Sequence, residues 1–433
     1  MRRTLHKPAF VLGGTEPEPV LPARFEYYNS YSLLSEDKTI SDKNKMVVDS
    51  KSQLPFGAPR SIIVLTREHI GDLVCTTPAL RSLRALYPDA QITVEVGERA
   101  AGVLANNPRI NDLMIRKDHQ GALGKLKVML ELRRRKYDLG VILDNATAMP
   151  LTLWAGGVAY RVGIVRKRRF ARLLNASTPF DRTIHEMVDN FRNVVALLGA
   201  DTSDKSTEVF PTENDGKAVD SMLAEAGITS EDTLIALNPG ASAPSNRWTP
   251  ERFAQLIDMF AGYDLNSPGL KGPTKCVVLG GPSDQGFVDD IRKLARHDFI
   301  QYTGKLSIME LAVVLGRCRV VVTGDTGPMH IAVAMRSTVV CLFGPAVPSE
   351  SGPGYSPGHR TIRKVESCPK CTKYLCREDH KCMRLITAEE VFEEVRGILD
   401  VGLIEEEMSE GGSVDPTEAD CALENEVESV SDG

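Results

Sequence analysis

The chain has 433 residues, of which 42% are hydrophobic and 25% are charged, so it is long enough for two domains with separate cores. No run approaches the roughly 18 to 20 apolar residues that span a bilayer. The N-terminus, MRRTLHKPAF, lacks the long apolar stretch of a signal peptide. From these features we expect a soluble, unexported protein of the cytoplasm.

The charge is distributed unevenly along the chain. Residues 405–433 contain eleven Asp or Glu and no Lys or Arg, so the formal net charge of −6 leaves about +5 on residues 1–404. Basic residues cluster at 133–136 (RRRK) and at 161–172 (RVGIVRKRRFAR). Such clusters suit an anionic membrane surface or a phosphorylated acceptor; the alternative is an ordinary solvated helix face and loop.

Residues 1–57 include TEPEPVLP and SEDKTISDKNK, which have neither helical nor strand periodicity, so we expect a disordered leader. Four short runs rich in β-branched residues follow, each separated from the next by a helix-length amphipathic segment: SIIVLT (61–66), QITVEV (91–96), DLMIR (112–116) and DLGVILD (138–144). This alternation predicts a parallel sheet flanked by helices, in a first domain over 58–205.

The same rhythm returns in the second half of the chain. Strands are expected at 233–240, 275–281, 319–325 and 337–345, with helices near 249–262, 284–297 and 307–316. The fold class is therefore α/β, with two Rossmann-like doubly wound domains.

The boundary between the domains is expected near 203–216, which is rich in turn formers. The second domain then covers 206–404 and includes a Cys-rich insert at 366–384. Thr387 precedes Glu390 at capping-box spacing, which predicts a closing helix from 387 onward. An acidic disordered tail is expected over 405–433.

The first expected strand is followed by REHIGD (67–72) and then by an amphipathic helix. Parallel α/β folds bind ligands at this edge of the sheet. Asp72 can act there as a general base that takes a proton from an acceptor hydroxyl, or it can simply cap the helix. The segment has no GxGxxG spacing, which argues against a dinucleotide site.

The segment NPGASAPSNRW (238–248) also follows a strand, and it offers hydroxyls, backbone amides and the guanidinium of Arg247 to a phosphate. The alternative is an ordinary Pro/Ser turn with Trp248 packed in the core.

The segment DTGPMH (325–330) is expected to begin a helix, with Thr326 as the cap and Pro328 in the first turn. The amides of such a helix start suit a diphosphate. His330 is either a structural residue of this helix or a ligand-binding residue.

Four cysteines lie close together, at Cys368, Cys371, Cys376 and Cys382. The spacing is compact enough for a tetrahedral metal site but is not that of a standard zinc finger. The alternatives are a structural zinc ion, reduced thiols and an iron–sulfur cluster. No cofactor is expected to be needed for catalysis.

Four segments, REHIGDLVCTTPALRSLRALYPDA, NPGASAPSNRWTPERFAQLI, VVLGGPSDQ and VVVTGDTGPMHIAVAMRSTVVCLFGP, together resemble glycosyltransferase family 9, the bacterial heptosyltransferases. The resemblance covers about residues 60–400, with the segments in the family's order. It implies a GT-B architecture, in which two Rossmann-like domains face each other across a cleft, and a metal-independent, inverting transfer.

The resemblance also implies roles for individual residues. Asp72 would be the catalytic base, in place of the cap that spacing alone favours. The remaining site positions are Gly71, Thr76 and Thr77 in an acceptor loop, and, around the nucleotide sugar, Ser242, Asn246, Arg247, Asp284, Asp325, Thr326, Gly327 and His330. One position departs from the family, because many members carry Lys where this chain has Asn246, and asparagine cannot neutralise a diphosphate.

The leading hypothesis is an enzyme that moves heptose from an ADP-activated donor to a lipopolysaccharide-core-type acceptor, at the inner face of the inner membrane. Its partners would be the nucleotide sugar, a lipid-linked or glycan acceptor and the membrane surface, and no nucleic acid. The alternatives are the same fold with another nucleotide sugar or acceptor, a catalytically silent GT-B-like binding protein, and a metal or redox sensor built on the cysteine cluster.

Overall fold

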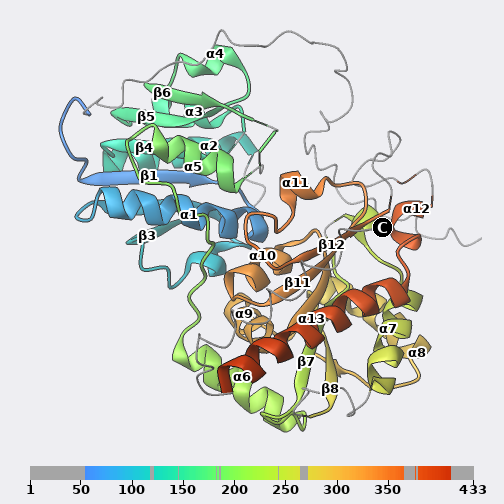
Figure 1. Cartoon of the computed structure of the whole chain (residues 1–433). Coiled ribbons are helices and arrows are strands. Elements are labelled where there is room, and N and C mark those ends of the chain that lie inside the picture. The colour runs from blue at the N-terminus through green and yellow to red at the C-terminus, as the bar shows by residue number, and fades with distance from the viewer. Residues whose placement is uncertain are drawn as a thin grey trace, which may run out of the picture. The chain divides into compact units, whose positions relative to one another are not determined.

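The computed structural model describes residues 54–117, 121–144, 146–181, 183–184, 187–241, 243–263, 272–364, 376 and 379–410 (Figure 1). Most of the expected leader, the tail beyond residue 410, Ser242, Cys368 and Cys371 lie outside these residues. Within them, no helix combines the length and apolar character needed to cross a bilayer.

The first sheet has six strands in the order β3-β2-β1-β4-β5-β6, and every neighbouring pair is parallel. The strands are β1 Ser61–Thr66, β2 Gln91–Gly97, β3 Asp112–Arg116, β4 Leu139–Leu143, β5 Tyr160–Val165 and β6 Ala176–Pro179. The accompanying helices are α1 Ile70–Leu86, η1 Ala101–Leu104, α2 Gly121–Arg135, α3 Met149–Ala155, α4 Arg168–Ala171 and α5 Val188–Ala196.

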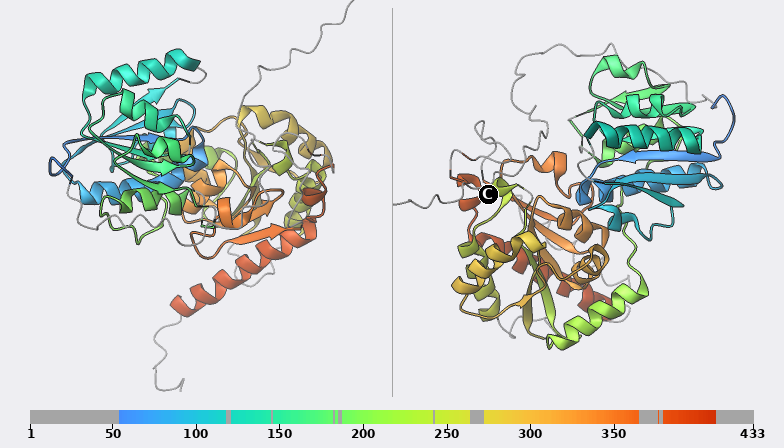
Figure 2. Two further views of the ribbon diagram at one scale, coloured as in Figure 1. Left: turned by 90° about the horizontal axis from the view of Figure 1, so that it is seen from above. Right: turned by 180° about the vertical axis from the view of Figure 1, so that it is seen from behind.

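Helices cover and bury both faces of this sheet, so the sequences of its central strands are continuously apolar. In β1, Ile62 and Val64 face the cluster that includes α1 and α5, whereas Ile63 and Leu65 face the cluster that includes α2 and α3. The two views in Figure 2, together with Figure 1, show these helix pairs on opposite sides of the sheet.

The second sheet repeats the topology, in the order β12-β11-β10-β7-β8-β9. Its strands are β7 Thr233–Asn238, β8 Thr274–Val278, β9 Ile300–Gln301, β10 Val320–Gly324, β11 Thr338–Phe343 and β12 Arg360–Arg363. The helices are α6 Glu213–Glu225, η2 Pro244–Asn246, α7 Pro250–Gly262, η3 Pro282–Asp284, α8 Gln285–Leu294, α9 Ile308–Arg317, α10 Gly327–Ala334, α11 Pro348–Ser351, α12 Lys381–Arg384 and α13 Ala388–Glu410.

Each sheet has one switch point, where strands that are distant in sequence lie side by side. These pairs are β1 with β4 and β7 with β10. Doubly wound folds bind ligands outside the carboxyl ends of such strands. The residues that follow these four strands are therefore the candidates for a ligand-binding site.

The strand pattern expected from sequence is confirmed, since eight strands begin within one residue of their predicted starts. Four further strands, β5, β6, β9 and β12, were not expected. Three of them lie at sheet edges, and β9 has only two residues, so their apolar signal is weak.

The closing helix begins as expected, because the Thr387 hydroxyl accepts a hydrogen bond from the Glu390 amide at 3.2 Å. Helix α13 extends to Glu410, beyond the boundary expected at residue 405, and the Glu and Met residues at 405–408 tolerate a helix well. The disordered tail stays a prediction. The boundary proposed near 203–216 stays a prediction.

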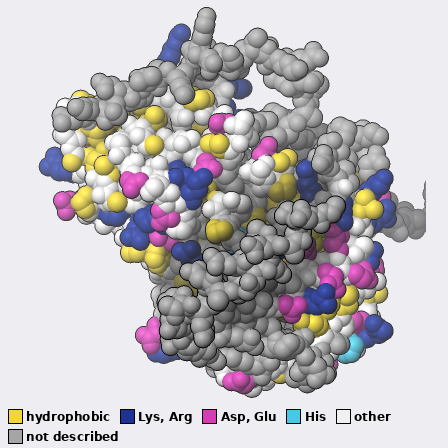
Figure 3. Space-filling view, viewed as in Figure 1, with side chains coloured by type: hydrophobic (Ala, Val, Ile, Leu, Met, Phe, Trp, Pro, Cys, Tyr) yellow, Lys and Arg dark blue, Asp and Glu magenta, His cyan; other side chains and the backbone are white. Residues whose placement is uncertain are grey.

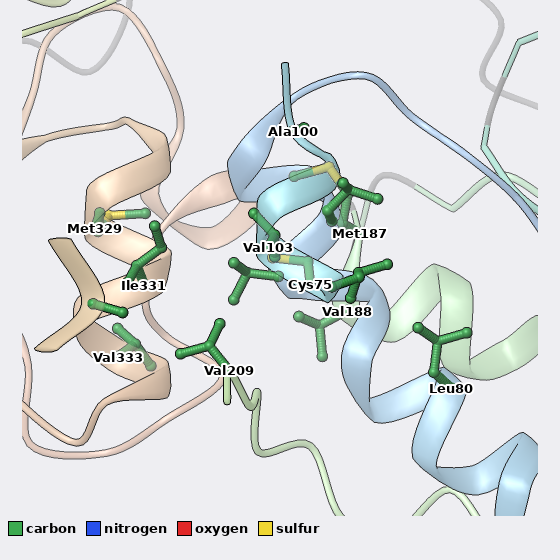
Figure 4. Packing of buried hydrophobic residues seen from close by; sticks show 14 of the residues in the cluster. Cys75, Leu80, Ala100, Val103, Met187, Val188, Val209, Met329, Ile331 and Val333 are labelled. Atoms are coloured by element: carbon green, nitrogen blue, oxygen red, sulfur yellow. The ribbon is translucent and has the colours of Figure 1, made fainter. Parts of the chain in front are cut away.

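Helices α1 and α10, one from each half of the chain, touch where both begin. A Cβ added to Gly71 would lie 2.7 Å from Cδ2 of His330, and one added to Gly327 would lie 3.0 Å from Cβ of Ile70. Behind this contact, Cys75 of α1, Val103 of η1 and Ile331 of α10 belong to one buried cluster, seen in Figure 4. Only glycine allows this approach.

Gly71→Ala should lower the free energy of unfolding by about 1 to 3 kcal/mol, the usual cost of overpacking. The cost arises because the His330 ring is 3% exposed and cannot move aside freely. Chemical denaturation should measure it. Gly286→Ala in α8 is the matched control, since a Cβ there meets nothing within 4 Å. Equal stability of Gly71→Ala and wild type would contradict the close packing.

Candidate active site

The first part of the site follows β1. Asp72 is the third residue of α1, not its cap, and the cap position His69 makes no capping hydrogen bond through its side chain. The Asp72 side chain is 12% exposed, and its Oδ2 atom is buried without a hydrogen bond. Arg67 Nε lies 3.2 Å from this oxygen. A buried carboxylate oxygen with no hydrogen bond is poised to accept one from a substrate hydroxyl.

A second carboxylate, Asp144, follows β4 directly, at the switch point beside β1. Arg67 Nε lies 3.8 Å from its Oδ1, so one guanidinium lies between the carboxylates of Asp72 and Asp144. Burial raises the pKa of Asp144, and the charge of Arg67 opposes that rise. Its Oδ1 also accepts a hydrogen bond from the Ala146 amide at 2.9 Å.

Further acidic groups surround this pair. Glu95 on β2 and Glu68 both bind the guanidinium of Arg116 at the end of β3. Burial raises the pKa of Glu95, although Arg116 acts in the opposite sense. With all groups ionised, Glu68, Asp72, Glu95 and Asp144 outnumber Arg67 and Arg116 by two charges. The first half of the site is therefore acidic, which suits a hydroxyl-rich substrate better than an anionic one.

The second part of the site follows β7 and β10. The Asn238 amide donates to Thr323 Oγ1 at 2.9 Å and to Thr326 Oγ1 at 3.2 Å, which ties the ends of the two strands together. Thr326 is the cap residue of α10, as expected, yet its side chain makes no capping hydrogen bond. Pro328 lies in the first turn. No side chain caps the start of α10. Because Pro328 has no N–H and the Met329 amide donates to the Thr326 carbonyl at 3.2 Å, the Gly327 amide is the first-turn donor suited to an anion.

Arg247 and Asp284, both expected at the nucleotide sugar, bind each other. Arg247 Nη2 lies 2.6 Å from Asp284 Oδ1 and 3.3 Å from the Ala241 carbonyl. Asp284 Oδ2 accepts from the Gly281 amide at 2.9 Å. These contacts join the loops after β7 and β8, so the charge of Arg247 is already compensated by a carboxylate.

Two further residues expected at the nucleotide sugar, Asp325 and Asn246, make different contacts. Asp325 accepts a hydrogen bond from Ser351 Oγ at 3.0 Å. Asn246 ends η2, and its carbonyl lies 3.0 Å from where a Cβ on Gly324 would be. Trp248 packs in the core, where its indole nitrogen donates to the Ile386 carbonyl at 3.0 Å. Ser242 lies outside the described residues.

Gly71, Thr76 and Thr77, expected in an acceptor loop, lie inside α1, which begins three residues earlier than the pattern from Leu73 predicts. Thr76 and Thr77 are fully buried and donate to the carbonyls of Leu73 and Val74. The Thr77 hydroxyl also accepts from the Glu208 amide at 3.0 Å. Contact of these residues with an acceptor stays a prediction.

His330 is buried at the contact between α1 and α10. Its Nδ1 lies 3.4 Å from Cys75 Sγ and 3.0 Å from the Tyr355 hydroxyl. The rings of His330 and Tyr355 are stacked. These contacts favour the structural interpretation of His330. Ligand binding at the other expected site residues stays a prediction.

Only half of the cysteine cluster falls within the described residues. Cys376 Sγ accepts a hydrogen bond from the His380 amide at 3.0 Å, and Cys382 on α12 is buried in the second core. The zinc site stays a prediction.

The structure brings Asp72 and the start of α10 together. A Cβ on Gly327 would lie 3.4 Å from the Gly71 amide nitrogen, one residue from Asp72. The carboxylate-bearing first turn of α1 thus lies against the start of α10.

Sequence reasoning missed Arg67, Glu95, Arg116, Asp144 and Asn238. Asp144 and Asn238 each carried a signal, since a polar residue ended an apolar run. Glu95 carried one too, as an acid inside such a run. No sequence pattern shows that Arg67 lies between two carboxylates.

Two halves with the same doubly wound strand order, packed against each other through α1 and α10, give the chain the GT-B architecture of solved glycosyltransferases. Residues 125–382 match the profile of glycosyltransferase family 9 (heptosyltransferase). The chain belongs to this family and is a transferase enzyme.

Relatives match over most of their length. The chain is 24% identical to lipopolysaccharide heptosyltransferase 2 of Salmonella typhimurium over 354 residues, which cover 78% of this chain and 98% of the relative. It is 26% identical to lipopolysaccharide heptosyltransferase 3 of Escherichia coli over 286 residues, covering 63% and 79% of the two chains.

Solved structures superpose on most of this chain. The family 9 glycosyl transferase of Veillonella parvula superposes with a TM-score of 0.70 at 27% identity, covering 78% of this chain and 97% of that one. The E. coli ADP-heptose lps heptosyltransferase II superposes with a TM-score of 0.62 at 22% identity, covering 78% and 98%.

Asp144→Asn should slow turnover about tenfold or more, because Arg67 loses one of its two carboxylates and no longer holds Asp72 as firmly. The same change should also raise the free energy of unfolding relative to wild type, by an amount that grows as the pH rises. A carboxyl whose pKa is raised by folding stabilises the protein fully below its unfolded pKa of about 4 and loses that contribution as pH rises through the folded pKa.

Turnover and denaturation midpoints from pH 4 to pH 8 would check both effects. The midpoint of Asp144→Asn, relative to wild type, should rise across this range. A merely structural role would predict a lower midpoint throughout, with no change in turnover of the folded fraction.

Proposed function

We propose that this enzyme transfers heptose from an ADP-activated donor to a lipopolysaccharide-core-type acceptor, with Asp72 as general base. Its relatives are lipopolysaccharide heptosyltransferases, and an E. coli relative of the same fold has been solved with ADP-2-deoxy-2-fluoro heptose. The observation that carries the proposal is the buried Asp72 oxygen without a hydrogen bond, next to the start of α10.

In this mechanism the acceptor hydroxyl donates a hydrogen bond to Asp72. As its oxygen attacks the anomeric carbon, the proton passes to the carboxylate and the bond between that carbon and the diphosphate breaks. The transition state resembles an oxocarbenium ion, and attack opposite the leaving group inverts the anomeric centre. Arg67 orients the carboxylate from 3.2 Å away.

The leaving ADP must be stabilised without a lysine at position 246. Arg247 is paired with Asp284 and is 28% exposed, so it is poorly placed to replace that lysine. We assign the diphosphate to the first amides of α10, beside Thr326 and Gly327. A helix start supplies amide donors and a partial positive charge.

The acceptor is expected on the first half of the chain, where the acidic network lies. Its lipid-linked form would bring the enzyme to the inner face of the inner membrane. Another sugar nucleotide or acceptor remains the closest rival, and donor screening separates the two.

Asp72→Asn should reduce ADP release from ADP-heptose and a truncated lipopolysaccharide core by at least about a hundredfold, the usual contribution of a general base. ADP is quantified by a coupled assay. Asp220→Asn, which alters an exposed ion pair with Arg317, is the matched control and should keep wild-type activity.

Retention of more than a tenth of the activity by Asp72→Asn would rule out its role as the base. If wild type released no nucleoside diphosphate from any of the nucleotide sugars with any acceptor, a silent binding protein would be favoured.

Asn246→Lys should tighten ADP binding about fivefold or more at low salt, because the added ammonium would face the diphosphate. Calorimetric titration with ADP measures the affinity, and raising the salt concentration should shrink the gain. An unchanged affinity would place the diphosphate away from position 246. Lys293→Gln, at an exposed pair on α8, controls for net charge.

A further inference from the structure

Four large apolar side chains are exposed on α2 and α3, the helices that cover one face of the first sheet. Leu126 and Leu130 on α2 are 50% and 56% exposed, and Leu151 and Trp154 on α3 are 41% and 55% exposed. Each pair is spaced by three or four residues, so both members share one helix face. We call these four residues the α2–α3 face.

The two helices form one surface rather than two separate ones. They pack against each other, and Arg133 Nε donates to the Ala155 carbonyl at 2.7 Å, next to Trp154. Arg133 follows Leu130 by three residues and Leu126 by seven, which puts all three on the same side of α2. The exposed side of α2 therefore borders the end of α3.

The charge around this face is mainly positive, although Glu131 on α2 pairs with Arg134 and Arg135. Residues 121–180 contain twelve Lys or Arg and three Asp or Glu, although the whole chain has a net charge of −6. No acidic residue occurs between 145 and 180. Four basic side chains near α4, which packs against α3, are exposed: Arg166, Lys167, Arg169 and Arg172. On the side of α1 and α5, shown in Figure 3, acidic and basic side chains are interspersed.

We propose that the α2–α3 face docks on an anionic lipid bilayer. Leu, Trp and flanking Lys or Arg are the combination that binds the headgroup region, with apolar side chains inserted and cations on lipid phosphates. This inference rests on the proposed function, since it explains how a lipid-linked acceptor is reached.

The topology connects the α4 end of this surface with the catalytic residues. Trp154, by contrast, lies at the end of α3 just before β5 begins, and so at the opposite, amino edge of the sheet. Helix α4 follows β5, so its basic residues lie at the carboxyl edge of the parallel sheet, the same edge as Asp72 and Asp144. A bilayer in contact with α4 thus lies on the edge where the acceptor saccharide must enter.

A second copy of the chain fits this face less well. Two copies would bring the same excess of positive charge together, and like charges disfavour a symmetric contact. An anionic bilayer offers the opposite sign.

Tryptophan fluorescence reports this docking directly, because the chain has two tryptophans and only Trp154 is exposed, whereas Trp248 is 2% exposed. The full chain is titrated with unilamellar vesicles of phosphatidylethanolamine and phosphatidylglycerol, or of phosphatidylcholine alone. We expect a blue shift with the anionic vesicles that high salt reverses. Trp154→Phe should remove the shift.

Vesicle sedimentation tests the contributions of the apolar and the basic side chains separately. Leu126→Ser with Leu130→Ser, and Lys167→Gln with Arg172→Gln, should each weaken partitioning at least about tenfold. The control is Leu294→Ser on α8, which is 47% exposed and should partition like wild type. All variants should keep the wild-type turnover on a deacylated, water-soluble acceptor.

Equal binding to neutral and anionic vesicles, or no loss in either double variant, would overturn the proposal. A wild-type dimer that Leu126→Ser with Leu130→Ser converts to monomer would overturn it in favour of self-association. Since these vesicles contain neither donor nor acceptor, failure of the proposed transferase reaction leaves this result unaffected.

Discussion

The structure depends on the close approach of two helix starts, α1 and α10, at Gly71 and Gly327. A side chain at either position would meet His330 or Ile70, so the contact exists only because both residues are glycine. It joins one switch point to the other and puts a carboxylate beside uncapped helix amides. Both helix starts carry partial positive charge, and Asp72, in the first turn of α1, offsets part of it. The packing of two helices thus determines where the chemistry can occur.

The two parts of the site differ in electrostatic character. The first is acidic, and Arg67 holds two buried carboxylates that would otherwise repel each other. Keeping Asp144 ionised in this environment costs stability, which folded proteins commonly accept at functional sites. In the second, Asp284 compensates the charge of Arg247, and Asp325 adds a further carboxylate at the start of α10. If a diphosphate binds here as proposed, backbone amides rather than side-chain cations are its donors.

Function and surface are connected through the same sheet edge. Parallel strands end together, so Asp72, Asp144 and the basic segment before α4 share one edge although they are far apart in sequence. On the proposed function, the lipid end of an acceptor would meet the α2–α3 face and its saccharide end the acidic network.

The sequence by itself determined the two α/β halves, because buried parallel strands need short apolar runs, which can be recognised in the sequence. It also determined the family, through four motifs in the family's order. It also placed Asp72 and the 325–327 segment after strands. Only the tertiary structure decided that Arg67 lies between Asp72 and Asp144, that Arg247 and Asp284 neutralise each other, and that Thr76 and Thr77 are buried inside α1. These are contacts between residues up to 77 positions apart or hydroxyls turned back onto their own helix, and neither leaves a local pattern. The physical reason is that periodicity records which face is buried, whereas the pairing of charges depends on which strands become neighbours.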